Sequence, residues 1–198
     1  MTLTMERLKA LLEGEKFKYF LDPAMDKLML SARGLHGSYQ LLVLLELEGQ
    51  FIQFRSMNYH SCPVDHEHLA ATLRVLGGLN YQLRFVKFGW DASDGEIVAY
   101  GDCWIEDGDL TQKQFGRMIH AYLAMMDLNY ARIDGTVRTG EDPGEIGSDG
   151  GGGGPSGLPP VIQSLLDRFL AGLGGGGGGG GDDDDDDEKD DEGPMTKW

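Results

Sequence analysis

Residues 38–57 read SYQLLVLLELEGQFIQFRSM and predict two β-strands joined by a short connection that contains glycine. Apolar residues occupy alternate positions in each half, a period that places them on one face of a strand: Tyr39, Leu41, Val43, Leu45 and Leu47, then Ile52 and Phe54. Leu42 and Leu44 make the other face of the first strand apolar as well, which is typical of a central strand. This hairpin is the expected centre of a sheet.

Further elements are predicted on either side of this hairpin. A strand over 27–33 precedes it, and a helix over 4–13 begins at Thr4, which can cap it, and ends at Gly14. A helix over 64–76 follows, with Pro63 near its first turn and a stop at Gly77-Gly78. Its expected buried residues are Leu69, Leu73 and Leu76. Strands over 82–90 and 96–106 are separated by an Asp94-Gly95 turn signal.

The third helix has the strongest signal in the chain. Thr111 and Gln114 form a capping box at its start. An apolar stripe with helical spacing follows, which must pack either on a sheet or on another subunit: Phe115, Met118, Ile119, Tyr122, Leu123 and Met126. The element order is therefore α-β-β-β-α-β-β-α. This order predicts an α+β fold, a five-stranded antiparallel sheet with flanking helices.

The composition changes after residue 135. Glycine runs occupy 150–154 and 174–181, and six aspartates occupy 182–187. The net charge of −16 is shared equally between residues 1–150 and 151–198. We therefore predict a domain over 1–135, a flexible Gly-rich linker over 136–158, an amphipathic helix over 159–173 and a disordered acidic tail over 174–198.

Acidic charge with no basic stripe argues against a nucleic-acid partner. The longest apolar run, 41–45, is too short for a membrane span, and the N-terminal residues lack the apolar core of a signal peptide. Cys62 and Cys103 are too few for a disulfide framework. A cytoplasmic protein with reduced thiols is expected.

Two stretches of the chain form a recognisable pattern. The first runs from Leu79-Asn80-Tyr81 through Phe88 to Asp94-Gly95-Glu96, and the second is 107–111, followed by a helix rich in Phe, Met and Leu. With the element order, these stretches resemble the YbjN family of sensory transduction regulators, which shares the fold of type III secretion chaperones. The resemblance covers residues 3–133. It implies a small bacterial cytosolic α+β domain, often dimeric, with no catalytic residues.

A cluster of potential metal ligands lies in the segment NYHSCPVDHEH, at His60, Cys62, His66 and His68. Imidazole and thiolate bind zinc, but the spacing matches no familiar zinc frame. We interpret the segment as a loop between a strand and a helix. A metal sensor or enzyme built on these four residues is the alternative, and no cofactor is otherwise expected.

The leading functional hypothesis is a non-catalytic, protein-binding regulatory or chaperone-like module, for example in signal transduction or stress regulation, that uses the sheet and the third helix for dimerisation or partner capture. Its candidate contact residues lie in the third helix and in the later amphipathic segment: Phe115, Met118, Ile119, Tyr122, Val161, Ile162, Leu165, Leu166 and Phe169. Segment 161–170 docks either on its own domain or on a partner, and the sequence does not distinguish the two. A third hypothesis is an assembly protein whose acidic tail contacts a basic partner.

Overall fold

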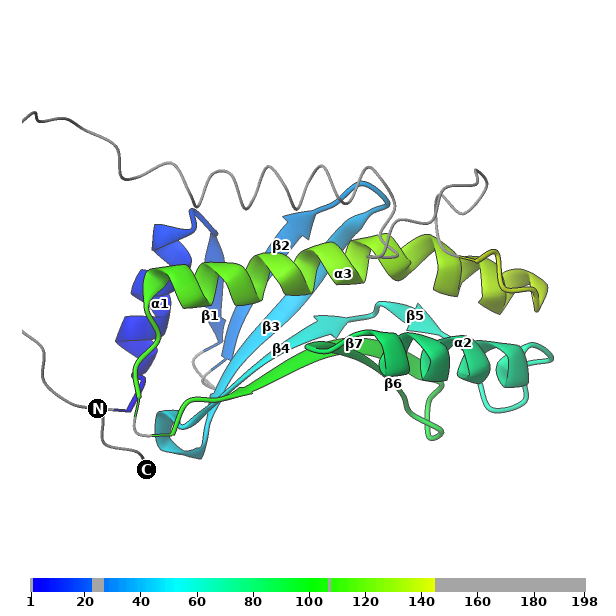
Figure 1. Ribbon diagram of the computed structural model, residues 1–198, viewed down its shortest axis with the longest axis horizontal. Coiled ribbons are helices and arrows are strands. Elements are labelled where there is room, and N and C mark those ends of the chain that lie inside the picture. Colours follow the sequence, from blue (N-terminus) through cyan, green and yellow to red (C-terminus); the bar gives the residue numbers. More distant parts are fainter. Residues whose placement is uncertain (1, 23–26, 107, 145–198) are drawn as a thin grey trace, which may run out of the picture. The chain divides into compact units, whose positions relative to one another are not determined.

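One antiparallel sheet forms the framework of the chain in the computed structural model, which describes residues 2–22, 27–106 and 108–144 (Figure 1). The sheet has seven strands within these residues: β1 Tyr19–Asp22, β2 Lys27–Arg33, β3 Ser38–Glu46, β4 Phe51–Met57, β5 His60–Ser61, β6 Val86–Trp90 and β7 Glu96–Trp104. A short 3-10 turn, η1 Leu47–Gly49, joins β3 to β4.

The strands from β1 to β4 follow one another in space as they do in sequence. β7 then pairs along one edge with both β4 and the two-residue β5, and along its other edge with β6. Asn58, in the left-handed region at φ 49°, lies between β4 and β5. β1 and β6 are therefore outer strands of the sheet, and the two-residue β5 also pairs with β7 alone among the described strands.

Three helices cover one face of the sheet: α1 Met5–Gly14, α2 Leu69–Gln82 and α3 Gln112–Thr139 (Figure 1). Their apolar residues meet every second residue of the strands in one continuous core, because a strand directs alternate side chains to the same face. The strand residues on this side include Leu28, Leu41, Val43, Ile52, Phe54 and Ala99, each no more than 2% exposed.

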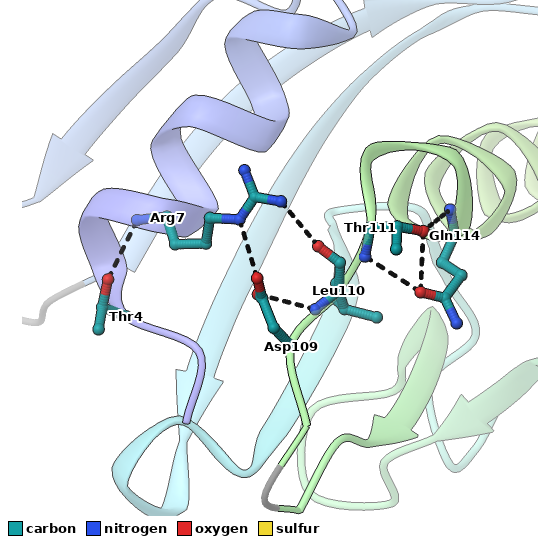
Figure 2. A network of polar contacts seen from close by, with 6 residues as sticks. All are labelled: Thr4, Arg7, Asp109, Leu110, Thr111 and Gln114. Carbon is teal, nitrogen blue, oxygen red and sulfur yellow. Dashed lines mark hydrogen bonds and ion pairs between the residues drawn. The ribbon is translucent and has the colours of Figure 1, made fainter. Parts of the chain in front are cut away.

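A polar network ties the start of α1 to the segment that precedes α3 (Figure 2). The backbone N–H of Arg7 donates to Thr4 Oγ1 (3.2 Å), as expected for a capping residue. The Arg7 guanidinium contacts Asp109 Oδ2 (3.3 Å) and donates to the Leu110 carbonyl (3.0 Å). The predicted capping box of Thr111 and Gln114 is present at the next residues.

The predicted α+β architecture with an antiparallel sheet is confirmed. The strands predicted over 27–33 and 51–57 have the same bounds in the structure. The predicted count of five strands is too low, because β1 and β5 were missed. With four and two residues, these strands are too short to show an alternating pattern, and they form by pairing with longer neighbours.

The second helix differs from its prediction at both ends. Pro63 forms a turn with His66 before the helix, and the helix starts at Leu69. It continues through Gly77 and Gly78, because residues on both sides of them face the core. The buried residues are Thr72, Val75, Leu76 and Leu79, whereas Leu73, predicted to be buried, is 39% exposed.

The third helix extends beyond the predicted domain end at residue 135. Ile133 and Thr136 are fully buried, and the helix ends at Thr139, where Gly140 takes up the left-handed conformation at φ 75°. The predicted helix over 159–173 and acidic tail over 174–198 lie outside the described residues, as does most of the predicted linker. None of the described helices is long and apolar enough to span a membrane.

Candidate functional site

The sheet face opposite the helices carries side chains in rows that cross several strands. The longest row follows the strand register from one outer strand to the other, through Phe20, Met29, Leu42, Arg55, Tyr100 and Lys87. The next row contains Asp22, Lys27, Leu44, Gln53 and Asp102, and a third contains Glu46, Phe51 and Trp104. We call these three rows, with Glu96, the open face, since no described helix lies over their strands. Only at the β6 end does a described helix reach this face, where Lys87 Nζ donates to the carbonyls of Asn80 (2.7 Å) and Leu83 at the end of α2.

Aromatic side chains are exposed at two ends of the open face. Phe20 is 66% exposed on β1, and Trp104 is 62% exposed at the end of β7. The Trp104 ring packs against Phe51 with the centroids 5.1 Å apart. Single exposed apolar residues are ordinary, but aromatic residues on one continuous surface are typical of a protein contact.

Two polar pairs join neighbouring strands on the open face. Arg55 Nη2 lies 3.3 Å from Glu96 Oε2, and Gln53 Nε2 donates to Asp102 Oδ1 (2.8 Å). Leu42 and Leu44 lie beside these pairs, and Leu44 is only 7% exposed. The face therefore presents apolar area bordered by charges of both signs.

A shallow depression of about 370 Å³ lies over the middle of this face. Its lining includes Lys27, Leu42, Leu44, Gln53, Arg55 and Glu96. An open hollow of this kind suits side chains of a polypeptide better than an enclosed small molecule, which proteins usually bury on most sides.

Asp127 of α3 is the most buried carboxylate among the described residues, at 7% exposure. It accepts hydrogen bonds from the backbone N–H groups of Leu35 (2.8 Å) and His36 (3.0 Å) and from the Tyr39 hydroxyl (2.5 Å). Burial acts to raise the pKa of Asp127, but these donors outweigh it and lower the pKa below its ordinary value. With its oxygens satisfied, the group anchors the β2–β3 turn to α3 and is not poised for proton transfer.

The four candidate metal ligands do not form one group, although the rings of His66 and His68 lie side by side with centroids 5.5 Å apart. Cys62 is buried and its thiol contacts Thr72 Oγ1 (3.8 Å), while His66 Nδ1 accepts from the backbone N–H of His68 (3.1 Å). His60 lies in β5 between the rings of Tyr59 and Tyr130, at centroid distances of 4.5 and 4.4 Å. In the part of the chain that the structure describes, no three His, Cys, Asp or Glu side chains form a group that could hold a metal ion.

The candidate contact residues of α3 face the inside of the domain. Phe115, Ile119 and Tyr122 are fully buried, and the Tyr122 hydroxyl donates to the Ala99 carbonyl (2.9 Å). Met118 is half-buried against the same core. Of the two predicted ways to cover this stripe, the structure shows packing on the chain's own sheet, so these side chains are not available to a partner in the folded domain. Val161, Ile162, Leu165, Leu166 and Phe169 lie outside the described residues.

The open face was not identified as a site from the sequence. Alternation within each strand gives the two faces but not which of them the helices cover. The missing information was the strand register, which aligns residues from six strands into one surface.

Comparisons with known proteins agree with this architecture. Residues 4–135 match the model of the YbjN family, described as "Putative bacterial sensory transduction regulator". No curated protein sequence matched the chain.

Among solved structures, YbjN from Escherichia coli is similar to 68% of this chain and 94% of its own, at 16% identity and a TM-score of 0.54. A protein of the HopA1–SchA chaperone–effector complex is similar to 60% of this chain and 86% of its own, at 12% identity and a TM-score of 0.41. A protein of the ExsC–ExsE complex is similar to 67% of this chain and 97% of its own, at 14% identity and a TM-score of 0.37. By the match over 4–135, this chain belongs to the YbjN family.

Proposed function

We propose that this protein is a non-catalytic regulatory or chaperone-like module of the bacterial cytosol that binds a polypeptide partner on its open face. The observation that carries the proposal is the row from Phe20 to Lys87, which crosses six strands on a face that no described helix covers. A surface of this length suits a polypeptide segment rather than a small ligand.

The chemistry of the face indicates which segment it fits. Leu42 offers apolar contact at the centre, and Arg55 and Glu96 offer one charge of each sign beside it. A matching segment carries apolar side chains at its centre and charged residues next to them. The family description supports a regulatory role. A role of segment 161–170 or of the acidic tail in the same binding remains a prediction.

The proposal is tested by capture from the cytosol of the source organism with full-length protein as bait. Leu42→Glu and Trp104→Lys alter the open face. Tyr81→Lys is the matched control, since Tyr81 is 92% exposed on α2, away from this face. We expect both open-face variants to lose a protein that wild type and Tyr81→Lys retain, identified by mass spectrometry.

Binding of the same protein by all four baits would show that the open face is not the site. A bait that ends at Gly144 separates the remaining explanations. If it retains the partner, the binding surface lies in the described domain, whereas loss of the partner would place it after residue 144. Circular dichroism of each variant checks that the fold is intact.

A further inference from the structure

One outer edge of the sheet is closed by a side chain. Asn80 of α2 donates from Nδ2 to the Phe88 carbonyl (2.8 Å) and accepts at Oδ1 from the Phe88 N–H (2.7 Å). The amide therefore occupies both backbone groups that an additional strand would use at this position of β6. Coverage by a neighbouring element is a common protection of edge strands against unwanted pairing.

The opposite edge has no such cover among the described residues. β1 pairs with β2 and with no other described strand, and it ends the strand order of the sheet. Phe20 of β1 is 66% exposed, and Lys18, the residue before the first residue of β1, is also exposed. An exposed edge strand with an apolar residue at its centre is a template for addition of another strand.

The sequence of this edge is complementary to itself. Residues 18–22 read KYFLD. When a second copy runs antiparallel and the pairing is centred on Phe20, Lys18 of each copy lies opposite Asp22 of the other. The two Phe20 side chains then meet at the centre, and Tyr19 lies opposite Leu21. Opposite charges and apolar residues directly across from one another both stabilise an antiparallel pair.

We propose that two copies of this chain associate through antiparallel pairing of β1, in the register that is centred on Phe20. The two-fold axis then passes between the Phe20 residues, perpendicular to the joined sheets, and both copies contribute the same patch. A rotation about such an axis leaves each sheet face on its own side. The two open faces therefore join into one surface, and the described helices of both copies lie on the other side.

Sedimentation velocity of full-length protein over a range of concentrations tests this inference, with Phe20→Lys as the disrupting variant. We expect a concentration-dependent dimer for wild type and a monomer for Phe20→Lys. Trp104→Lys is the matched control, because it places the same charge on the open face away from β1, and it should keep the dimer. This readout is independent of the proposed partner, so either proposal can fail alone.

A charge exchange tests the register. Lys18→Asp and Asp22→Lys each place like charges opposite one another in the two-fold pair, so each variant alone should be monomeric. Mixed together, they place opposite charges at both positions, so the mixture should form a heterodimer. Asp22 also has an interaction within its own chain, so circular dichroism is used to check the fold of each variant.

Three results would overturn the inference. Wild type that stays monomeric at all concentrations excludes the association. A dimer that persists in Phe20→Lys places the interface elsewhere. A mixture of Lys18→Asp and Asp22→Lys that remains monomeric, with both variants folded, rejects the register centred on Phe20.

Discussion

Asp127 shows how one buried carboxylate can hold two distant parts of the chain together. Its three hydrogen-bond donors come from the β2–β3 turn and from β3, about 90 residues away in sequence. We expect Asp127→Ala to lower the free energy of unfolding by about 2–4 kcal/mol, because two backbone N–H groups and a buried hydroxyl lose a charged acceptor. Asp134→Ala on the same helix removes an ion pair with Arg138 and a negative charge near His60, and it should cost less than about 1 kcal/mol.

The lowered pKa of Asp127 also fixes the pH dependence of this contribution. A carboxylate whose pKa is lower in the folded state stabilises the fold above its ordinary pKa, near 4, and loses that contribution as the pH falls further. Urea unfolding of wild type and Asp127→Ala should therefore differ most at neutral pH and converge in strong acid. A constant difference from pH 6 to pH 2 would contradict this role.

His60 is expected to act in a separate pH window. Burial lowers its pKa to about 4, and its Nε2 atom is buried with no hydrogen-bond partner among the residues that the structure describes. Between about pH 6.5 and 4 the unfolded chain binds a proton that the folded chain does not, so stability falls as the pH falls through this range.

The size of this effect is at most about 3–4 kcal/mol, because the pKa of His60 falls from 6.5 to about 4 and each unit of pKa corresponds to about 1.4 kcal/mol. His60→Phe keeps an aromatic ring beside Tyr59 and Tyr130 and should remove this part of the pH dependence. Unfolding free energies of wild type and variant at pH 7 and pH 4.5 measure it. An equal loss of stability in both proteins would assign the pH dependence to other groups.

At the scale of elements, the glycines of α2 and of η1 have opposite consequences. A Cβ at Gly77 would meet no atom within 4 Å, and the residue has no left-handed backbone. Gly77→Ala should therefore stabilise the protein by about 0.5–1 kcal/mol, since glycine in a helix interior costs backbone entropy.

Gly49 is the contrasting position. It has φ 87°, and a Cβ there would lie 2.0 Å from the backbone oxygen of Leu3. Gly49→Ala should cost more than about 2 kcal/mol. Thermal unfolding of wild type and the two single variants measures whether each substitution raises or lowers the stability. A Gly49→Ala variant that is more stable than wild type would contradict the described turn.

The same glycines explain which elements could be predicted from the sequence. The rule that glycine ends a helix placed the stop of α2 at Gly77-Gly78, but Leu79 is buried and Asn80 bonds β6, so tertiary contacts extend the helix. α3 was recognised because its cap and its periodic stripe are both local signals. β1 was missed because it depends on pairing with Lys27–Leu30, which no local pattern reveals.

For the candidate site, alternation along a strand indicates which side chains share a face of the sheet, but it does not indicate whether that face is exposed. That depends on where α1, α2 and α3 pack, a property of the whole fold.

At the scale of the whole molecule, the domain extends farther than its composition indicates. The last turns of α3 bury Thr136 and pack Val137 against the core. Arg132 forms a bidentate ion pair with Asp142, in which Nε donates to Oδ1 (2.8 Å) and Nη2 donates to Oδ2 (2.7 Å). We expect a truncation after Gly144 to unfold at the same temperature as the full chain. A truncation after Asp134 should unfold about 10 °C lower, because it removes these contacts.

Calorimetry of the three proteins measures the difference. Equal midpoints for both truncations would show that the end of α3 contributes nothing to stability. The result also decides which of the two truncated chains is suitable for binding experiments with the described domain.

The contact of Asn80 with Phe88 has a consequence for aggregation. Fibrils elongate when every added chain presents a new edge to the next one, which requires two open edges on each molecule. In the described sheet the β6 edge is blocked at Phe88, whereas no described side chain blocks the β1 edge in this way. Association of two copies at β1 would use up that edge, and the assembly would terminate at two chains instead of polymerising.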